Sequence, residues 1–386
     1  MSFGTQPIVI FLTINDIPRH SATINIPTRK NNVTPPYRAL KNESCARFWG
    51  WCALVFLGAG TAGAWDYSSH SVINQLALAS LPTNFPAFVL APAQRERIAF
   101  LSGEPDRWRS NPGLSLRNAN GPDHYIDLEE LKLCDLTPDQ LPPLRYTFAA
   151  LFAQARAAHP ERFEAINPEM DQDQTRELTG FLPWTIVEYT DKLESCFSYL
   201  KTFERAGGTP AEIANAQADV VYVMGVMGHF VGDGSQPLHT TIHFNGWVGD
   251  NPHGYTTNRT FHAWIDGGYF RKTGEPKLET LAGKIHPAES VGEEGRPDGL
   301  FRAVVAYLVD QNELVETLYQ LEKEGKLFGE GEQGLAGRPF LEGQLIKGGQ
   351  MLGNIWWTAW LHAPEDFYLR GQLEQRSARN SSAPAK

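Results

Sequence analysis

The sequence predicts an all-α protein, and three observations support this. Apolar residues recur at helical spacing through most of residues 65–375, alternation of apolar and polar residues is scarce, and Pro and Gly separate the periodic segments. No internal repeat is evident, and no linker interrupts the periodicity. We therefore expect a single compact multi-helix domain over residues 65–375.

Each expected helix is a periodic segment that begins or ends beside a Pro or Gly. In chain order the segments are Tyr67–Leu81 before Pro82, Ala93–Leu101 after Pro92, Leu144–Ala158 after Pro143, Thr185–Arg205 after Pro183, Pro210–Val231 before Gly232, Leu278–Ile285 before Pro287, Leu300–Glu322 after Gly299 and Phe340–Trp360 after Pro339. Gly, Pro, Asn and Asp are concentrated in residues 102–127 and 234–260, which predicts two long loops. The polar residues 376–386 predict a disordered tail.

The composition excludes several classes of protein. Of the 386 residues, 42% are hydrophobic and 20% are charged, which is typical of a folded chain and not of low-complexity or collagen-like sequence. The net charge of −10 argues against a broad basic surface for duplex nucleic acid, because such binding needs clustered Lys and Arg. Any phosphate-bearing substrate must therefore be attracted locally.

One apolar run, Phe48–Gly60, follows a basic segment and precedes Ala62 and Ala64. Its 13 residues are fewer than the ~20 that span a bilayer as a helix, and the two alanines fit an A-x-A cleavage site. We interpret residues 1–64 as an N-terminal extension and signal peptide that is removed. This interpretation predicts a secreted or periplasmic protein. An uncleaved anchor or a buried helix is the alternative.

Cleavage after Ala64 would change both charge and cysteine content. Residues 1–64 hold 6 basic and 2 acidic residues, so residues 65–386 carry a net charge of −14. Cys134 and Cys196 would be the remaining cysteines. They could pair in an oxidising compartment or stay as separate thiols.

Histidine and aspartate occur four residues apart in two segments. VYVMGVMGHFVGDGSQPLH holds His229 and Asp233, with His239 just after, and FHAWID holds His262 and Asp266. A helix places residues i and i+4 on one face, and imidazole nitrogen and carboxylate oxygen are ligands that zinc prefers. One such pair is more often a surface pair or a satisfied core histidine. Two pairs and a third histidine within one window indicate a metal site.

Two loops add further candidates. GEPDRWR contains Asp106 and Arg109, and GPDHYID contains His124 and Asp127. Both lie in segments where the backbone can bend around an ion.

Trp65 would become the first residue after cleavage, and His70 follows five positions later. A freed terminal amine and the carbonyl oxygen of the same residue form a five-membered chelate, but only if the peptide bond to Ala64 has been cut. Processing would then complete the metal site.

These motifs, in this order, resemble a known family. WDYSSH, the Asp106 loop, HYID, HFVGDGSQPLH and FHAWID look like the trinuclear zinc family that joins fungal and plant single-strand-specific nucleases to bacterial phospholipases C. The ligand motifs run from 65 to 266, and GGQMLGNIWWTAW near the C-terminus resembles the closing helix of the family. The resemblance implies three Zn²⁺ ions as cofactors.

Nine ligand positions follow from the resemblance. The first zinc would be held by Asp106, His124, His229 and Asp233, the second by His239, His262 and Asp266, and the third by the amine and carbonyl of Trp65 with His70 and a bridging Asp233.

The spacing resembles the nuclease branch of the family. The step from Trp65 to His70 is short, and the last ligand is an aspartate, Asp266, where phospholipases have a glutamate. Arg109 and Asp127 stand where nuclease relatives keep an arginine and an aspartate beside the cleaved phosphate. The resemblance therefore implies catalytic roles for both, and a structural ion pair is the alternative.

Two further positions bear on the substrate. Tyr125 would either stack on a nucleobase as a substrate-binding residue or pack in the core. Gly267 differs from the family, in which a side chain that helps to bind phosphate often follows the last ligand.

We expect a secreted zinc-dependent phosphodiesterase, of nuclease or 3′-nucleotidase type, that hydrolyses single-stranded nucleic acid or 3′-nucleotides through a metal-activated water. The alternative is a zinc-dependent phospholipase C acting on phospholipid head groups, with exposed aromatic residues contacting the membrane. Those aromatic residues would be Phe244, Trp247, Tyr255, Trp264 and Tyr269. A third hypothesis is a zinc-binding protein without turnover, its cleft covered by residues 129–215.

Overall fold

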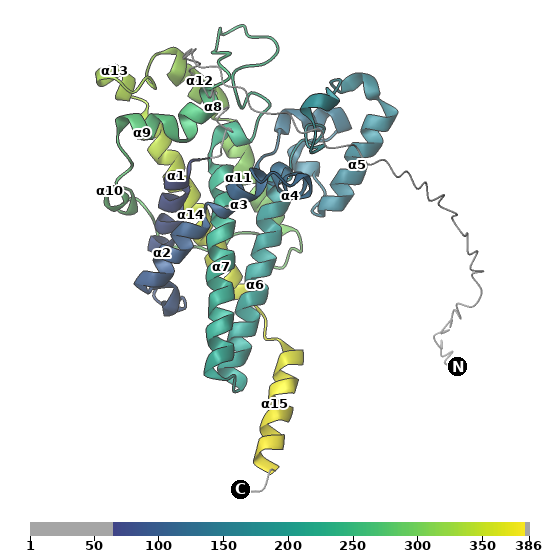
Figure 1. The fold of residues 1–386 in the computed structure, drawn as a ribbon, viewed down its shortest axis with the longest axis vertical. Helices are drawn as coiled ribbons and strands as arrows, with labels where there is room; N and C mark the ends of the chain where they lie inside the picture. The colour runs from purple at the N-terminus through teal and green to yellow at the C-terminus, as the bar shows by residue number, and fades with distance from the viewer. Residues whose placement is uncertain (1–64, 383–386) are drawn as a thin grey trace, which may run out of the picture. The chain divides into compact units, whose positions relative to one another are not determined.

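Two long helices, α6 (Leu182–Ala206) and α7 (Pro210–Ser235), form a hairpin at the centre of the fold (Figure 1). The turn between them is short because Gly207 adopts φ +86 after the last residue of α6. Thr209 then caps α7 through a reciprocal pair of hydrogen bonds with Glu212, in which each side chain bonds the backbone N–H of the other. Local capping thus fixes the direction in which α7 leaves the turn.

The computed structural model describes residues 65–382, so the expected signal peptide lies outside the described residues. The fold is all-α, as the sequence predicts. Among residues 65–382 there is no β-strand, and one isolated bridge pairs Phe244 with Gly246. The described residues form one compact helical unit.

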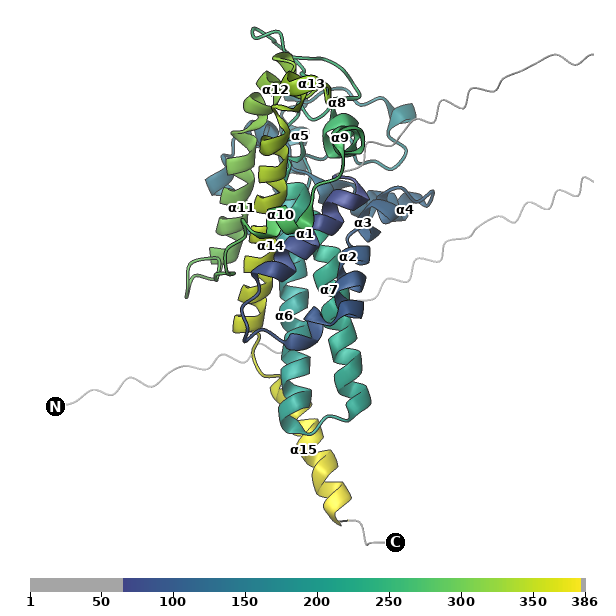
Figure 2. The ribbon, with the colours of Figure 1, turned by 90° about the vertical axis from the view of Figure 1, so that its left-hand side faces the viewer.

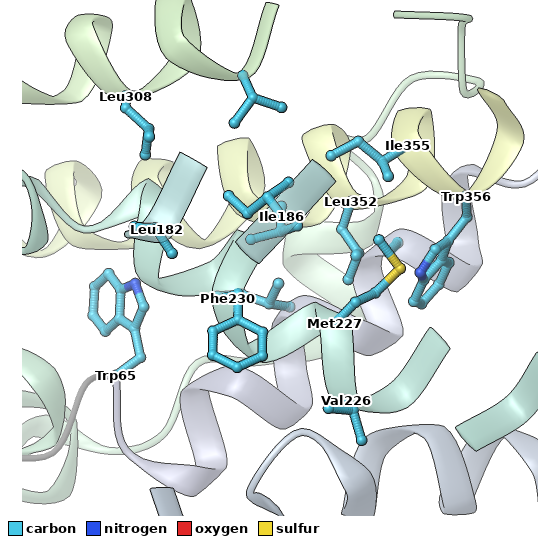
Figure 3. Close-up of a cluster of buried hydrophobic side chains, with 14 of the residues drawn as sticks. Trp65, Leu182, Ile186, Val226, Met227, Phe230, Leu308, Leu352, Ile355 and Trp356 are labelled. Atoms are coloured by element: carbon cyan, nitrogen blue, oxygen red, sulfur yellow. The ribbon is translucent and has the colours of Figure 1, made fainter. Parts of the chain in front are cut away.

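Helix α14 (Arg338–His362) and helix α11 (Gly299–Asn312) pack on the α6–α7 hairpin. Figure 3 shows apolar side chains from these helices meeting in one buried cluster, with Phe230 of α7 and Trp356 of α14 among them. This apolar contact holds the C-terminal half of α7 inside the protein, where its polar residues are also buried.

Helix α1 (Tyr67–Ser80) packs across α14 and α7 (Figure 2). Glycines on α7 permit this close approach, because a Cβ on Gly228 would lie 1.8 Å from Asn74 Oδ1 and one on Gly232 would lie 2.8 Å from His70 Nδ1. Asn74 in turn donates hydrogen bonds to the carbonyls of Ile98 and Gly225, at 2.9 and 3.0 Å. The first helix is therefore fixed by packing and by hydrogen bonds.

Most predicted helices are present, with small shifts at their ends. The matching elements are α1, α2 (Pro92–Leu101), α5 (Arg145–Ala158), α6, α7, α10 (Leu278–Ala282), α11 and α14. The prediction that α7 ends at Val231 was wrong, since the helix continues to Ser235. Gly232 does not end the helix because it serves as the contact point for His70. Both residues of the first His–Asp pair consequently lie on one continuous helix.

The segment 102–127, predicted as a loop, is largely helical. It contains α3 (Glu104–Arg109), α4 (Leu114–Asn120) and the 3₁₀ turn η2 (Gly121–His124). Acidic residues in the first turn of α3 and arginines in its last turn complement the helix dipole, a charge pattern that favours even this short helix.

The predicted helix Leu300–Glu322 is two helices, α11 and α12 (Val315–Lys323). At the break, Asn312 donates a hydrogen bond of 2.8 Å to the carbonyl of Thr240. This tertiary bond and the burial of Tyr319 against Phe261 turn the chain, although the apolar periodicity continues through it.

The C-terminal helix α15 (Phe367–Ser382) corrects the prediction of a disordered tail at residues 376–382. Arg376 forms an ion pair with Glu212 at 2.7 Å and donates to the carbonyl of Gly207, so the tail is tied to the turn of the hairpin. Residues 383–386 lie outside the described residues.

The remaining described elements are short. They are α8 (Phe261–Ala263), α9 (Tyr269–Thr273), α13 (Gly331–Leu335), the 3₁₀ turns η1 (Ala87–Leu90), η3 (Leu128–Cys134), η4 (Pro138–Gln140), η5 (Pro160–Arg162), η6 (Pro168–Met170) and η7 (Pro237–His239), and the π-helical turn η8 (Trp264–Gly268). Cys134 and Cys196 are free thiols, and burial raises the pKa of each to about 11. Within residues 65–382, none of the helices combines the length and apolar character needed to cross a membrane.

Candidate metal centre

The last two turns of α7 carry His229 and Asp233, both fully buried. His229 Nδ1 lies 2.7 Å from the carbonyl oxygen of Ser102. A carbonyl only accepts, so Nδ1 carries the proton and Nε2 presents its lone pair to the interior. Helix α7 therefore supplies one imidazole nitrogen and one carboxylate, four residues apart, on a single buried face.

Three other elements bring donor atoms to Asp233. Its Oδ1 lies 3.3 Å from His70 Nε2 of α1, and its Oδ2 lies 2.9 Å from His124 Nδ1 of η2. His229 Nε2 is 3.4 Å from Oδ2 and 3.8 Å from Asp106 Oδ1 of α3. Two groups of donor atoms result, each with its atoms within 4.8 Å of one another: His70, His229 and Asp233, and Asp106, His124 and His229.

A third group comes from the segment after α7. His239 and His262 face each other with their Nε2 atoms 3.0 Å apart, and His262 Nε2 lies 3.2 Å from Asp266 Oδ2. His239 Nδ1 is 2.7 Å from the carbonyl of His124, which again leaves Nε2 free to act as a ligand. Because His239 Nδ1 also lies 3.9 Å from Asp233 Oδ1, the third group adjoins the first two.

Unpartnered polar atoms show that these residues fit a metal ion. His70 Nδ1 and Nε2, His124 Nε2, Asp233 Oδ1 and Asp266 Oδ2 are all buried without a hydrogen-bond partner. Leaving several such atoms unpaired in a protein interior is costly. A cation among them would satisfy the carboxylates and imidazole lone pairs together.

Burial sets the protonation of the group. It lowers the pKa of His239 to about 4 and lowers the pKa of the other four histidines well below the ordinary value, so all five imidazoles are neutral near pH 7. Burial also raises the pKa of Asp233 and Asp266 well above the usual range. Neutral imidazoles can bind a metal directly. A bound cation would favour the ionised carboxylates and so lower the pKa of Asp233 and Asp266 again.

Trp65 is held beside these groups, although its backbone rather than its side chain is the predicted ligand. The indole is fully buried, its Nε1 donates to Ser235 Oγ at 3.2 Å, and its ring stacks near Phe270. The next residue, Asp66, donates its backbone N–H to the carbonyl of Asp266 at 3.0 Å. The backbone of Trp65 therefore passes between the end of α7 and the turn that carries Asp266.

The three predicted substrate-facing residues have different partners, and the partner of Arg109 is a candidate ligand. Arg109 Nε donates to Asp106 Oδ1 at 2.8 Å, which holds the guanidinium next to a candidate ligand. Asp127 donates its backbone N–H to Thr179, and burial, with Glu130 and Glu129 nearby, raises the pKa of its carboxyl well above the ordinary value. Tyr125 is half-buried and donates its hydroxyl to the carbonyl of Leu178 at 3.2 Å.

Sequence reasoning missed Gln236, which donates from Nε2 to Asp266 Oδ1 at 2.7 Å and so orients that carboxylate. The signal was present in the GDGSQPLH motif, where Gln236 lies between Asp233 and His239. The structure also explains why position 267 holds a glycine and no larger residue, because a Cβ there would lie 2.1 Å from Asp66 Oδ2.

Two other histidines, His243 and His253, belong to none of the donor groups. His243 stacks on Trp247 with ring centres 3.8 Å apart, and His253 contacts Tyr255. Of the five aromatic residues considered for membrane contact, Tyr255 and Tyr269 are buried, Trp247 and Trp264 are partly buried, and Phe244 is exposed. The expectation that these aromatic side chains are exposed is therefore wrong for Tyr255 and Tyr269.

The fold and the site together define an all-α protein in which buried histidines and aspartates form groups that could hold metal ions. Eight of the nine predicted ligand residues contribute side chains to these groups. Comparison of the chain with protein-family models and with curated proteins finds no match.

Proposed function

We propose that this protein is a zinc-dependent phosphodiesterase that hydrolyses single-stranded nucleic acid or 3′-nucleotides. The observation that carries the proposal is the convergence of five buried imidazoles and three carboxylates from seven separate elements on one region. Neutral imidazole nitrogens mixed with carboxylate oxygens are a donor set suited to zinc. The residue types and their order along the chain add the resemblance to the trinuclear zinc nucleases.

Three zinc ions are proposed, with Asp233 as the shared ligand. Its two oxygens face opposite neighbours, Oδ1 toward His70 and Oδ2 toward His124 and His229. This orientation suits a carboxylate that bridges two ions. The ion between His239, His262 and Asp266 would be separate, and the ion near His70 would also use the freed amine and carbonyl of Trp65.

When bound, these ions would supply Lewis-acid polarisation of a phosphate ester and a nucleophile at neutral pH. Arg109, which is partly exposed beside Asp106, would bind the phosphate oxygens and offset their negative charge. Asp127 would orient the attacking water or accept its proton, a role to which its raised pKa is suited. Tyr125, half-buried next to His124, would line the substrate side of the site.

Charge explains how an acidic protein could bind a phosphodiester. Three divalent ions against Asp106, Asp233 and Asp266 would leave a local charge of about +3. The surrounding residues 65–386 carry a net charge of −14. Attraction would therefore be confined to the metal centre.

Metal analysis combined with a substrate panel tests the proposal. Protein that begins at Trp65 should contain about three zinc ions per chain and should release product from denatured DNA, RNA or 3′-AMP, with phosphatidylcholine unchanged. Lipid turnover without nucleotide release would instead indicate a phospholipase C. Zinc without turnover of any phosphodiester would favour a binding protein.

A further inference from the structure

A groove of about 470 Å³ lies between α1 and α2, outside the groups of candidate ligands. Its walls carry polar, charged and aromatic side chains. The residues that matter here are Tyr67, Ser71 and Gln75 on α1, and Arg95, Glu96 and Phe100 on α2. The three residues from α1 are spaced by four, so they follow one face of that helix along about 12 Å.

One end of the groove adjoins the candidate metal centre. The ring of Tyr67 lies on Gly103, where an added Cβ would be 2.6 Å from Tyr67 Cδ2. The residue before Gly103 is Ser102, whose carbonyl oxygen fixes His229. Two contacts through Gly103 and Ser102 thus separate Tyr67 from the candidate ligand His229.

One arginine, Arg95, lines the groove on the α2 side, and Arg97 and Arg107 lie beside it against Phe100. Neither Arg95 nor Arg97 has a carboxylate oxygen within 4.0 Å among the described residues. The guanidinium groups of Arg97 and Arg107 lie over the ring of Phe100, 5.5 and 4.7 Å from its centre, so the ring holds both cations in place. Arg107 also pairs with Glu104. Glu96 lines the groove as well, so the surface is locally basic but not uniformly so.

Tyr67 offers an aromatic surface next to these cations. Its side chain is 50% exposed, with one part packed on Gly103 and the rest open to the groove. Sequence-independent binding of single strands combines cations that contact the backbone with aromatic rings on which bases stack. The groove presents both features in a short span.

We propose that the groove between α1 and α2 binds the part of a single-stranded nucleic acid that lies next to the cleaved bond. Arg95 and Arg97 contact its phosphates, and Tyr67 stacks on a base. This inference rests on the proposed function, and it adds that polymers bind more tightly than mononucleotides. Two or three cations suit a single strand, whereas duplex binding requires a broader basic surface.

The test measures binding of a fluorescein-labelled phosphorothioate dT12, which resists hydrolysis, to the metal-loaded protein by fluorescence anisotropy from 50 to 200 mM NaCl. The double variant Arg95→Gln/Arg97→Gln should bind more weakly. The slope of log Kd against log[NaCl] should fall by about 1.4, since each lost phosphate contact on a single strand removes ~0.7. Tyr67→Leu should weaken binding about tenfold and leave the slope unchanged.

Matched controls come from distant exposed residues. Lys347→Gln on α14 and Tyr368→Leu on α15, both at exposed positions, should leave dT12 binding within about twofold of the parent protein. The groove variants should also keep the parent's metal content and its kcat on 3′-AMP. Equal effects of control and groove variants, or unchanged binding in the groove variants, would overturn the proposal.

Two further results separate the groove from the proposed function. If dT12 binding responds as expected but no phosphodiester is hydrolysed, the groove stands and the proposed function fails. If 3′-AMP is hydrolysed but the groove variants bind dT12 like the parent, the groove alone fails. Loss of binding to phosphatidylserine-containing vesicles in these variants, with no binding of dT12 by any form, would show that the groove meets a lipid surface and would overturn the proposal.

Discussion

The two parts of the candidate metal centre are built in different ways. The groups around Asp233 take ligands from residues 70 to 233, on α1, α3, η2 and α7. The group around Asp266 takes all its ligands from residues 239 to 266, on η7, α8 and η8. One part is assembled by the packing of the whole domain, and the other by one short segment.

This difference affects how each carboxylate is supported. Asp266 has a dedicated side-chain partner in Gln236, while Asp233 Oδ1 has no hydrogen bond and faces His70 at 3.3 Å. A carboxylate whose oxygens face histidines on both sides depends on cations for compensation. We therefore expect the Asp233 part to be the more sensitive to loss of metal.

The largest expected effect is that of Asp233→Asn. Loss of the shared carboxylate should remove two of three zinc ions and lower kcat/KM on 3′-AMP by more than about 1,000-fold. Asp266→Asn, the matched change in the other part, should remove one ion. Metal content and steady-state rates measure both. An Asp233→Asn protein with three ions and the parent rate would refute the bridging role.

Misfolding is a separate explanation that thermal unfolding can exclude. Burial raises the pKa of Asp233, so the ionised carboxylate is unfavourable in metal-free protein and an amide should cost no stability there. Metal-free Asp233→Asn should therefore unfold at a temperature no lower than that of the metal-free parent. A much lower Tm would mean that the loss of activity reflects unfolding.

The next effect concerns the amine of Trp65. A protein that retains residues before Trp65 has an amide there in place of an amine, so it should contain two zinc ions, and the Asp266 part should be unaffected. Cleavage to begin at Trp65 should raise the metal content to three and raise activity. Equal zinc in the two forms would contradict the chelate.

As the pH falls, the Asp233 part, which includes the amine of Trp65, should lose an ion before the Asp266 part does. A free terminal amine has a pKa of ~7.7–8.0, so each pH unit below this costs about tenfold in affinity at Trp65. Burial lowers the pKa of His239 to about 4, so its nitrogen stays deprotonated as the pH falls from 8 to 5. Dialysis across this range should remove one ion first. Simultaneous loss of all ions would argue against the amine ligand.

The smallest effect is expected from Gln236→Ala, which frees Asp266 Oδ1 from its hydrogen bond. Affinity for the ion of the Asp266 part should fall about 10- to 100-fold, as is typical when a partner of a metal ligand is removed. The Asp233 part should be unchanged. Gln350→Ala on α14, whose side chain bonds to the backbone of His286, serves as the control. Competition with a zinc chelator measures both.

Some features of the site were readable from short-range spacing. His229 and Asp233, and His262 and Asp266, each lie four residues apart and do share a buried face. Helical periodicity likewise located the long helices. The exact end of α7, the break between α11 and α12 and the helices α3 and α4 were missed, because contacts such as Gly232 against His70 and Asn312 with Thr240 outweigh local preference.

By itself, the sequence determined the all-α class and the residue types available for chemistry, because periodicity and side-chain identity are local properties. Only the tertiary structure decided that His70, Asp106 and His124 meet the end of α7, and that Gln236 supports Asp266. Their convergence depends on α1 packing closely against both α7 and α14, which requires glycine at the contact points. This close packing depends on side-chain volumes and burial over the whole domain, so it cannot be predicted from any single sequence motif.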